Sequence, residues 1–391
     1  MSYTVLARRY RSRSFDEVVG QEAISRTLQN AIKANRVAHA YLFCGTRGVG
    51  KTSMARIFAK ALNCPDGKPA DVVDAIMQGR DIDVIEIDGA SNNKVEEARE
   101  LIANSIYRPM RGPYKIYIID EVHMLSTAAF NALLKTMEEP PEHVKFILCT
   151  TEPQKVLATI QSRCQRFDFR AIPTSRIMEH LQEVVKAEGL KADPELLQLV
   201  ARIGNGSMRD ALSLLDRLIA SGEPRLTVRL LEDLLGLPER EVLGSLLDAI
   251  ADGNVAASLE LTGGLLSRGI AAEQMLESLA DRLRDLLVIT ACGQATTLVD
   301  LSDEARTAEA ARASRYDEAG LVHMIALCES AQRTVRTSAA PRAMLEAAIV
   351  RLALTDKLAD VAALVLGAPT RAAPPRAAPD GTPAKKARRG S

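Results

Sequence analysis

Tryptophan is missing from the sequence, and phenylalanine and tyrosine together supply only 4% of its 391 residues. This scarcity argues against recognition of nucleic acid by stacked aromatic side chains. No uncharged apolar run reaches the length of about 18 residues that a membrane-spanning helix needs. The first ten residues also lack the apolar core of a secretion signal. We therefore expect a soluble, cytoplasmic protein.

Cysteine is sparse as well. No two of the six cysteines form a Cys-x-x-Cys pair, the pattern that would indicate a zinc knuckle or a redox site. They are Cys44, Cys64, Cys149, Cys164, Cys292 and Cys328. In a cytosolic chain we expect such cysteines to be free thiols, most of them buried as small apolar residues.

Fifty basic and fifty acidic residues leave the chain without net charge. The balance is uneven, because the segment from Gly367 onward carries six basic residues against Asp380 alone. The rest of the chain is therefore mildly acidic, and contact with nucleic acid requires a local basic patch. The segment 367–391 is also rich in proline and alanine, which predicts a disordered tail.

The length predicts more than one domain. Residues 1–172 alternate between helical periodicity and short apolar runs, a pattern typical of an α/β domain whose parallel sheet is covered on both faces. The predicted strands are 40–44, 83–87, 114–119 and 144–149. The predicted helices are 21–34, 51–62, 95–106 and 126–138.

Strand signals largely stop after Pro173. Helical spacing marks 174–188, 193–203, 207–220 and 228–235, so we expect a small helical domain over 173–237. The following segment, 238–366, is rich in alanine and leucine and predicts a second all-α domain. Its helices should break near Gly253, Gly269 and Gly293.

The strongest motif follows the predicted strand 40–44. Residues 45–52 fit the pattern GxxxxGK[ST], in which backbone N–H groups and a helix N-terminus surround phosphate groups. Lys51 is expected to reach the β- and γ-phosphates, and the Thr52 hydroxyl to bind Mg²⁺. The residues expected to hold the nucleotide here are Gly45, Thr46, Arg47, Gly48, Val49, Gly50, Lys51, Thr52 and Ser53.

A second motif ends the predicted strand 114–119. Asp120 stands at the carboxyl end of this strand, where it would hold Mg²⁺ beside the phosphate loop. Glu121 follows, in the place of a general base that polarises the attacking water. An apolar strand that ends in two acids is a weak signal alone. Together with the phosphate loop it predicts ATP hydrolysis.

These motifs resemble those of AAA+ ATPases and, among them, of the clamp-loader gamma/tau subunits of bacterial DNA polymerase III. The resemblance covers about residues 1–220 in chain order. Its matching segments are 9–11, 15–21, 45–56, 85–88, 120–125, 131–135, 138–144, 162–164 and 206–211. Beyond Leu235 it rests on helical content and position. It implies an AAA+ domain over 1–172, a helical lid over 173–237 and an all-α collar over 238–366.

The resemblance also implies roles for single residues. Val18 and Val19, with the residues up to Gln21 and the basic turn that precedes them, resemble the adenine-side wall of the nucleotide pocket. Thr151 resembles the sensor of the γ-phosphate, with Thr150 as its neighbouring rival. Arg209 resembles the sensor of the lid. Arg163 resembles an arginine finger that enters the ATP site of a neighbouring subunit, where a guanidinium neutralises charge on the transferred phosphoryl group.

Three further features stay open at this level. His123 follows the acidic pair, where it acts as a base or ligand, positions Glu121 or packs locally. Lys94 and Arg99 form either a solvated helix face or a patch for the DNA backbone. Family members commonly carry a four-cysteine zinc module after the phosphate-loop helix, but Cys64 is alone at that place, so we predict no zinc and a short helix over 71–77.

The resemblance implies an ATPase motor within a hetero-pentameric clamp loader, with ATP and Mg²⁺ as ligands. Its partners would be other loader subunits, the sliding clamp, primer–template DNA and the polymerase III core. It would belong to a DNA-directed DNA polymerase holoenzyme without polymerase chemistry of its own. Two alternatives are another AAA+ DNA motor, such as a branch-migration helicase, and a structural loader subunit that does not hydrolyse ATP.

Overall fold

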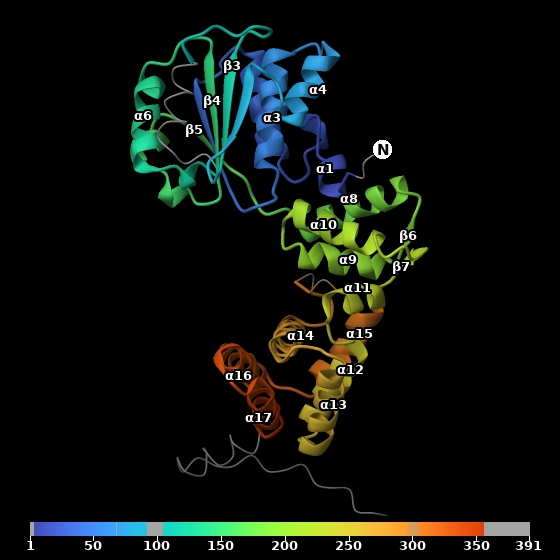
Figure 1. Cartoon of the computed structure of the whole chain (residues 1–391). Coiled ribbons are helices and arrows are strands. Elements are labelled where there is room, and N and C mark those ends of the chain that lie inside the picture. Colours follow the sequence, from blue (N-terminus) through green and yellow to red (C-terminus); the bar gives the residue numbers. More distant parts are fainter. Residues whose placement is uncertain are drawn as a thin grey trace, which may run out of the picture. The chain divides into compact units, whose positions relative to one another are not determined.

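A computed structural model describes residues 4–67, 69–91, 105–296, 298–299, 301 and 303–355. The chain divides into two compact units, 1–234 and 235–391 (Figure 1). Among the helices of the described residues, none is both long enough and apolar enough to cross a lipid bilayer.

A five-stranded parallel sheet forms the centre of the first unit, with the strand order β2-β3-β4-β1-β5. Because all strands run in the same direction, the carboxyl ends of β1, β3 and β4 lie along one edge of the sheet. The strands are β1 (Ala40–Cys44), β2 (Val84–Asp88), β3 (Lys115–Asp120), β4 (Val144–Thr150) and β5 (Gln165–Asp168).

The four predicted strands are confirmed to within a residue at their ends. Every residue of β1 and β4 is buried, as expected for central strands covered on both faces. The fifth strand, β5, was not predicted. Three of its four side chains are exposed, so it lacks the apolar run that identified the others.

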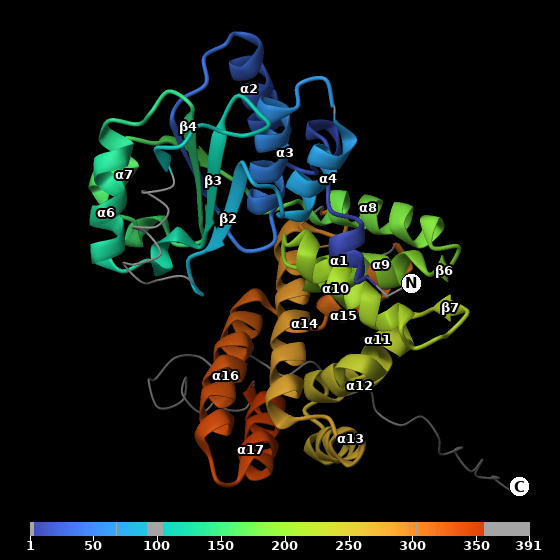
Figure 2. The same cartoon turned by 45° about the horizontal axis from the view of Figure 1, so that its top comes forward.

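Helices cover both faces of this sheet, with α6 on one face and α3 and α4 on the other (Figures 1 and 2). Each face has its own cluster of buried apolar side chains. Ser126 caps the N-terminus of α6 by accepting a hydrogen bond from the Ala129 N–H at 3.2 Å. The longer helices are α2 (Glu22–Lys33), α3 (Lys51–Asn63), α4 (Ala70–Gln78) and α6 (Thr127–Glu138), and the short ones are α1 (Leu6–Arg9), α7 (Ala158–Gln161) and the 3-10 turns η1 (Phe15–Glu17), η2 (Val122–Met124) and η3 (Pro153–Lys155).

The short helix predicted over 71–77 is present as α4. Residues 92–104 are outside the described residues. They include most of the helix predicted over 95–106, and also Lys94 and Arg99. The predicted disordered tail over 367–391 is also outside them.

A helical layer completes the first unit, as predicted for the residues after Pro173. Its helices are α8 (Thr174–Ala187), α9 (Pro194–Ile203), α10 (Met208–Ile219) and α11 (Val228–Leu235), the last of which runs to the boundary of the unit. Two residues each of β6 (Lys191–Ala192) and β7 (Arg225–Leu226) pair in parallel, an interaction too short for a sequence pattern to reveal.

In its described residues the second unit consists of helices. They are α12 (Arg240–Ala251), α13 (Val255–Ser267), α14 (Ala272–Cys292), α15 (Asp303–Ala313), α16 (Glu318–Thr337) and α17 (Pro341–Ala353). The predicted breaks are confirmed, since Gly253, Gly269 and Gly293 each follow a helix with a positive φ that favours glycine.

Charged side chains join three helices of this second unit. Arg282 of α14 and Arg312 of α15 both contact the buried carboxylate of Glu309, the latter at 3.1 Å. Arg312 also pairs with Asp248 of α12 at 3.0 Å. Because a buried carboxylate needs such partners, these contacts fix α12, α14 and α15 against one another.

Candidate nucleotide-binding site

The phosphate loop connects β1 to α3, as the sequence predicts. Gly50 precedes α3 with a φ of 100°, and Gly48 has a φ of 77°. Both values lie in the left-handed region that glycine adopts without strain. A side chain at Gly48 would also meet the Ser207 hydroxyl, because an added Cβ would lie 1.8 Å from its oxygen. The loop therefore needs glycine at this position to let the layer of α8–α11 approach.

Lys51 begins α3, and its side chain is buried, with only 6% of the residue exposed. Its ammonium group donates hydrogen bonds to the carbonyls of Gly45 at 2.8 Å and Thr46 at 2.9 Å. Burial lowers the pKa of Lys51. The lysine thus lies folded over its own loop, where phosphate oxygens would replace the two carbonyls as partners.

Thr52 and Asp120 are brought together, as predicted. The Thr52 hydroxyl donates a hydrogen bond of 2.7 Å to Oδ2 of Asp120, while Oδ1 of Asp120 accepts the Glu121 N–H at 3.1 Å. A hydroxyl and a carboxylate so close supply two of the hard oxygen donors that Mg²⁺ prefers. These two residues fit the metal that accompanies a nucleoside triphosphate.

Glu121 follows Asp120 with a φ of 45°, a left-handed conformation that is unusual for a side chain of this size. Thr151, at the end of the neighbouring β4, holds it in place: the Thr151 hydroxyl and N–H donate to Glu121 Oε2 at 3.0 and 3.2 Å. A carboxylate held in a strained backbone conformation is typical of functional sites.

The neighbouring Thr150 makes different contacts. Its hydroxyl lies 3.0 Å from Nδ1 of His123 and accepts the Glu152 N–H at 3.0 Å. His123 Nδ1 is also 3.4 Å from Glu121 Oε2. Of the two threonines considered as sensor, Thr151 is therefore the one bonded to Glu121. The His123 ring is packed between Thr150 and Glu121.

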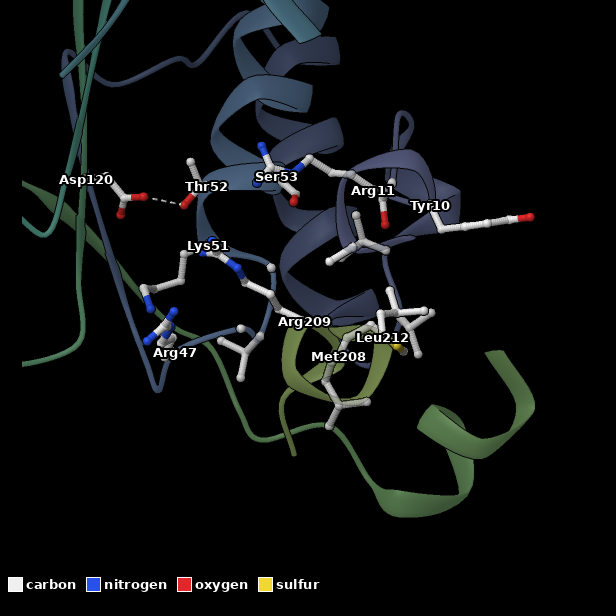
Figure 3. Close-up of a pocket in the computed structure, with 18 of the residues that line it drawn as sticks. Tyr10, Arg11, Arg47, Lys51, Thr52, Ser53, Asp120, Met208, Arg209 and Leu212 are labelled. Atoms are coloured by element: carbon white, nitrogen blue, oxygen red, sulfur yellow. Dashed lines mark hydrogen bonds between the residues drawn. The ribbon is translucent and has the colours of Figure 1, made fainter. Parts of the chain in front are cut away.

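A cavity of about 520 Å³ connects these groups (Figure 3). The predicted residues that line it are Val18, Val19, Arg47, Gly48, Val49, Gly50, Lys51, Thr52, Ser53, Asp120, Glu121 and Arg209. Gly45 and Thr46 contribute their carbonyls to Lys51 instead. Arg209 comes from α10, whose side chains Met208 and Leu212 add apolar surface.

Sequence reasoning missed several lining residues, because nothing in the local pattern marks them as neighbours of the loop. They are Ala7, Tyr10, Arg11, Ser12, Asp88, Ala90, Ile172, His180, Met208 and Leu212. The segment 9–11 is an exception, because it belonged to the matching motifs and the resemblance implied that the basic turn before Val18 is part of the adenine-side wall of the pocket. The structure places Arg11 at the cavity itself.

Two predicted features lie apart from this cavity. Arg163, just after α7, donates to the Thr159 carbonyl at 2.7 Å and pairs with Glu138 at 2.5 Å, with 32% of its side chain exposed. It is not among the residues that line the cavity. Cys64 is buried, which raises the pKa of its thiol. In the described ranges no three His, Cys, Asp or Glu side chains cluster as a metal site would require.

The fold and this cavity define a phosphate-loop nucleotide-binding protein of the AAA+ type. Three family models match successive parts of the chain. They describe the DNA polymerase III delta subunit at residues 20–173, the ATPase lid domain of a DNA polymerase III clamp loader subunit at 176–224, and domain III of DNA polymerase III subunits gamma and tau at 226–365.

Curated relatives agree with these models. The tau subunit of Escherichia coli is 46% identical over 74% of this chain and 46% of its own length. The tau subunit of Bacillus subtilis is 42% identical over 91% of this chain and 64% of its own. The gamma subunit of Buchnera aphidicola is 40% identical over 71% of this chain and 78% of its own.

The chain therefore belongs to the gamma/tau subunit family of DNA polymerase III. It spans about half the length of the longer tau relatives. Among solved structures, RuvB of Thermotoga maritima superposes with a TM-score of 0.45 and 20% identity over 62% of this chain and 79% of its own, a similarity too low to bear on function.

Proposed function

We propose that this chain is an ATP-hydrolysing motor subunit of the DNA polymerase III clamp loader, which loads the sliding clamp onto primed DNA during replication. The observation that carries the proposal is the cavity that joins Lys51, the Thr52–Asp120 pair and Glu121. A subunit that only binds nucleotide would not need the Glu121 carboxylate beside the Thr52–Asp120 pair that would hold the metal. The lid model at 176–224, which describes a clamp loader subunit, supports the link to the clamp loader, and the curated relatives support the link to DNA polymerase III.

The chain's own groups account for each step of hydrolysis. Lys51 leaves the Gly45 and Thr46 carbonyls and binds the phosphates. Thr52 and Asp120 would hold Mg²⁺, which neutralises charge on the β- and γ-phosphates when bound. Glu121 takes a proton from the attacking water, whose oxygen bonds to the γ-phosphorus as the bond to ADP breaks. Thr151 keeps the Glu121 carboxylate aimed, through its bonds of 3.0 and 3.2 Å.

Two arginines complete the proposed machinery. Arg209 lies at the cavity on α10 and would join the state of the nucleotide to the position of the lid. Arg163 lies outside the lining of its own cavity, which suits a finger that acts on a neighbouring subunit. Because the arginine comes from another copy or a related subunit, hydrolysis would depend on assembly of the ring.

The remaining parts receive roles by the same reasoning. We infer that residues 1–172 bind ATP, that 173–237 form the lid, that 238–366 form the collar through which a hetero-pentameric ring assembles, and that 367–391 are a basic tail. The partners would be the other loader subunits, the sliding clamp, primer–template DNA and the polymerase III core. Polymerase chemistry is not part of the proposal, and neither is zinc.

ATP turnover by the full chain in a reconstituted loader tests the proposal. We expect weak basal turnover that primed DNA and clamp together stimulate, and its loss in Lys51→Ala. Arg163→Ala should bind ATP as the unaltered chain does but show little stimulation. Normal stimulation in Arg163→Ala would contradict the trans role. A Lys51→Ala chain that turns over ATP normally would contradict the proposed function itself.

One alternative, a subunit that does not hydrolyse ATP, is disfavoured by the complete set of Lys51, Thr52, Asp120 and Glu121. The other, a branch-migration motor, would favour a winged-helix module with β-strands after the lid. Residues 240–353, where the structure describes them, contain helices and no strand.

A further inference from the structure

Arg11 stands out among the residues that line the cavity, because its guanidinium is partly buried and forms no ion pair with any residue that the structure describes. No hydrogen bond or ion pair joins it to another residue in the described part of the chain. Burial lowers the pKa of Arg11, and the positive charge of Arg56 acts in the same direction. A cation in such surroundings is costly until an anion reaches it.

The two carboxylates whose charges act on Arg11 are already engaged elsewhere. Glu86 accepts two hydrogen bonds from Arg56, at 2.6 and 2.7 Å. Asp120 is bonded to Thr52 at 2.7 Å and to the Glu121 N–H. Arg11 therefore has negative charge nearby, but the oxygens of these two carboxylates are bonded to other residues.

The position of Arg11 within the cavity indicates which anion would bind it. Figure 3 shows its side chain directed toward Ser53, in the first turn of α3. One side of Ser53 is marked by the Thr52–Asp120 pair, the expected metal end of the triphosphate. Apolar lining side chains, among them Val18 and Leu212, suit the base at the other end. A cation between the metal end and the base end of a bound nucleotide would lie opposite the phosphate nearest the ribose.

The residues just before Arg11 are fastened to the lid. Leu6 of α1 is 1% exposed, and its N–H donates to Asp216 of α10 at 3.2 Å. The Tyr10 hydroxyl donates to Glu188 at the end of α8, and Arg9 pairs with the same carboxylate. The chain thus passes from the lid at Tyr10 to the cavity at Arg11 in a single residue.

The residues just after Arg11 are fastened to the sheet domain instead. The Ser12 hydroxyl donates to the Glu17 carbonyl at 3.0 Å, and the Arg13 N–H donates to the Glu17 carboxylate at 2.7 Å. Lys60 of α3 donates to the Arg13 carbonyl. The N-terminal segment therefore links lid and sheet domain in addition to the covalent connection before α8 and to the ion pair of 3.1 Å between Arg176 of α8 and Glu22 of α2.

We propose that Arg11 binds the phosphate nearest the ribose and that α1 transmits this contact to the lid. The inference rests on the proposed function, since it requires a nucleotide in this cavity. Arg11 would be a binding residue for ADP as well as ATP. Tyr10 and Glu188 would be positioning residues that act through it. The lid would then respond to occupation of the cavity by any nucleotide, separately from the γ-phosphate response proposed for Arg209.

Calorimetric titration of the full chain with ADP and with ATPγS tests the binding step. Because Arg11 is placed at a phosphate that both ligands share, Arg11→Ala should weaken both by the same factor, about tenfold or more for a lost charged hydrogen bond. Arg11→Lys keeps the charge and should recover part of the loss. Unchanged affinities in Arg11→Ala, or a loss confined to ATPγS, would overturn the proposal.

Lys51→Ala separates this test from that of the proposed function. If the unaltered chain binds neither ligand, the proposed function fails and the role of Arg11 fails with it. A second outcome is that the unaltered chain binds both ligands, and that Lys51→Ala weakens their binding but Arg11→Ala does not. This outcome would refute the role of Arg11 alone.

Hydrogen exchange tests the transmission to the lid. Saturating ADP should slow exchange in α10 of the unaltered chain, and Glu188→Ala should remove most of this protection although ADP remains bound. The matched control is Glu179→Ala, which removes an exposed carboxylate from the same helix, where it pairs with Arg176 at 2.9 Å and does not line the cavity. Full protection in Glu188→Ala, or equal loss in both variants, would contradict transmission through α1.

Discussion

The ion pair between Arg56 and Glu86 should be essential to the placement of α4, the short helix that the sequence predicts over 71–77. Arg56 belongs to α3 and Glu86 to β2, and two hydrogen bonds of 2.6 and 2.7 Å join them. Arg56 also donates to the Met77 carbonyl in α4 at 2.8 Å. Only 13% and 20% of the two side chains are exposed.

Removing one member of this pair should cost far more than the pair contributes as a whole. Glu86→Ala leaves the Arg56 guanidinium partly buried without its partner, which typically costs about 3–5 kcal/mol. The double variant Arg56→Met/Glu86→Leu leaves no charge behind, so it should cost less than Glu86→Ala alone. The bond to Met77 is lost in the double variant, which adds about 1 kcal/mol.

Native-state hydrogen exchange of the full chain measures these costs locally. Glu86→Ala should raise exchange in α4 and β2, while peptides from α12–α17 serve as an internal reference. Asp71→Ala is the matched control, because its exposed pair with Arg111 at 3.7 Å also involves α4 but should contribute less than about 1 kcal/mol. A cost of Glu86→Ala no larger than that of Asp71→Ala, or a double variant as costly as the sum of its single changes, would refute the reasoning.

Three further predictions concern the cavity. Gly48→Ala should cost at least about 1–2 kcal/mol for its left-handed backbone. Ser207→Ala should recover the part of the additional cost that comes from the clash with the Ser207 hydroxyl, while the Ser207 Cβ stays 2.9 Å from the added Cβ. A double-mutant cycle in thermal unfolding that shows no coupling would contradict the close approach of the lid. Burial lowers the pKa of Lys51, and phosphates bind its charged form, so nucleotide affinity should fall as pH rises through that lowered pKa. Calorimetry in buffers of different ionisation enthalpy should detect proton uptake on binding at alkaline pH. Thr52→Val removes the hydroxyl bonded to Asp120 while it keeps the shape of the side chain. ADP affinity should therefore lose its dependence on Mg²⁺ and change little in EDTA. An equal loss of ADP affinity with and without Mg²⁺ would argue against a metal at this pair.

The sequence predicted the parts of the site that depend on local pattern. The phosphate loop requires glycines and a lysine at fixed spacing, and Asp120 ends an apolar strand, so both motifs were recognisable before any contact was known. The parallel sheet then brings them together, since β1 and β3 end at the same edge. That Thr52 is bonded to Asp120 follows from this geometry.

Other parts of the site could not be found in this way. His180 and Leu212 reach the cavity only because the lid folds back over the loop, and their local sequence carries no signal of that contact. The strand β5 was missed because it lies at the edge of the sheet and exposes most of its side chains. That Thr151, and not Thr150, is hydrogen-bonded to Glu121 could be found only from the structure.

The position of β1 has a consequence for synthesis of the chain. All five of its residues are apolar and buried, and they pair only with β4 and β5, which begin at Val144 and Gln165. During translation β1 therefore leaves the ribosome long before either partner exists, and an unpaired apolar strand is prone to aggregate. We therefore expect nascent chains that stall before Val144 to need chaperones. The strand that leads into the phosphate loop makes the chain prone to aggregation during the early part of its synthesis.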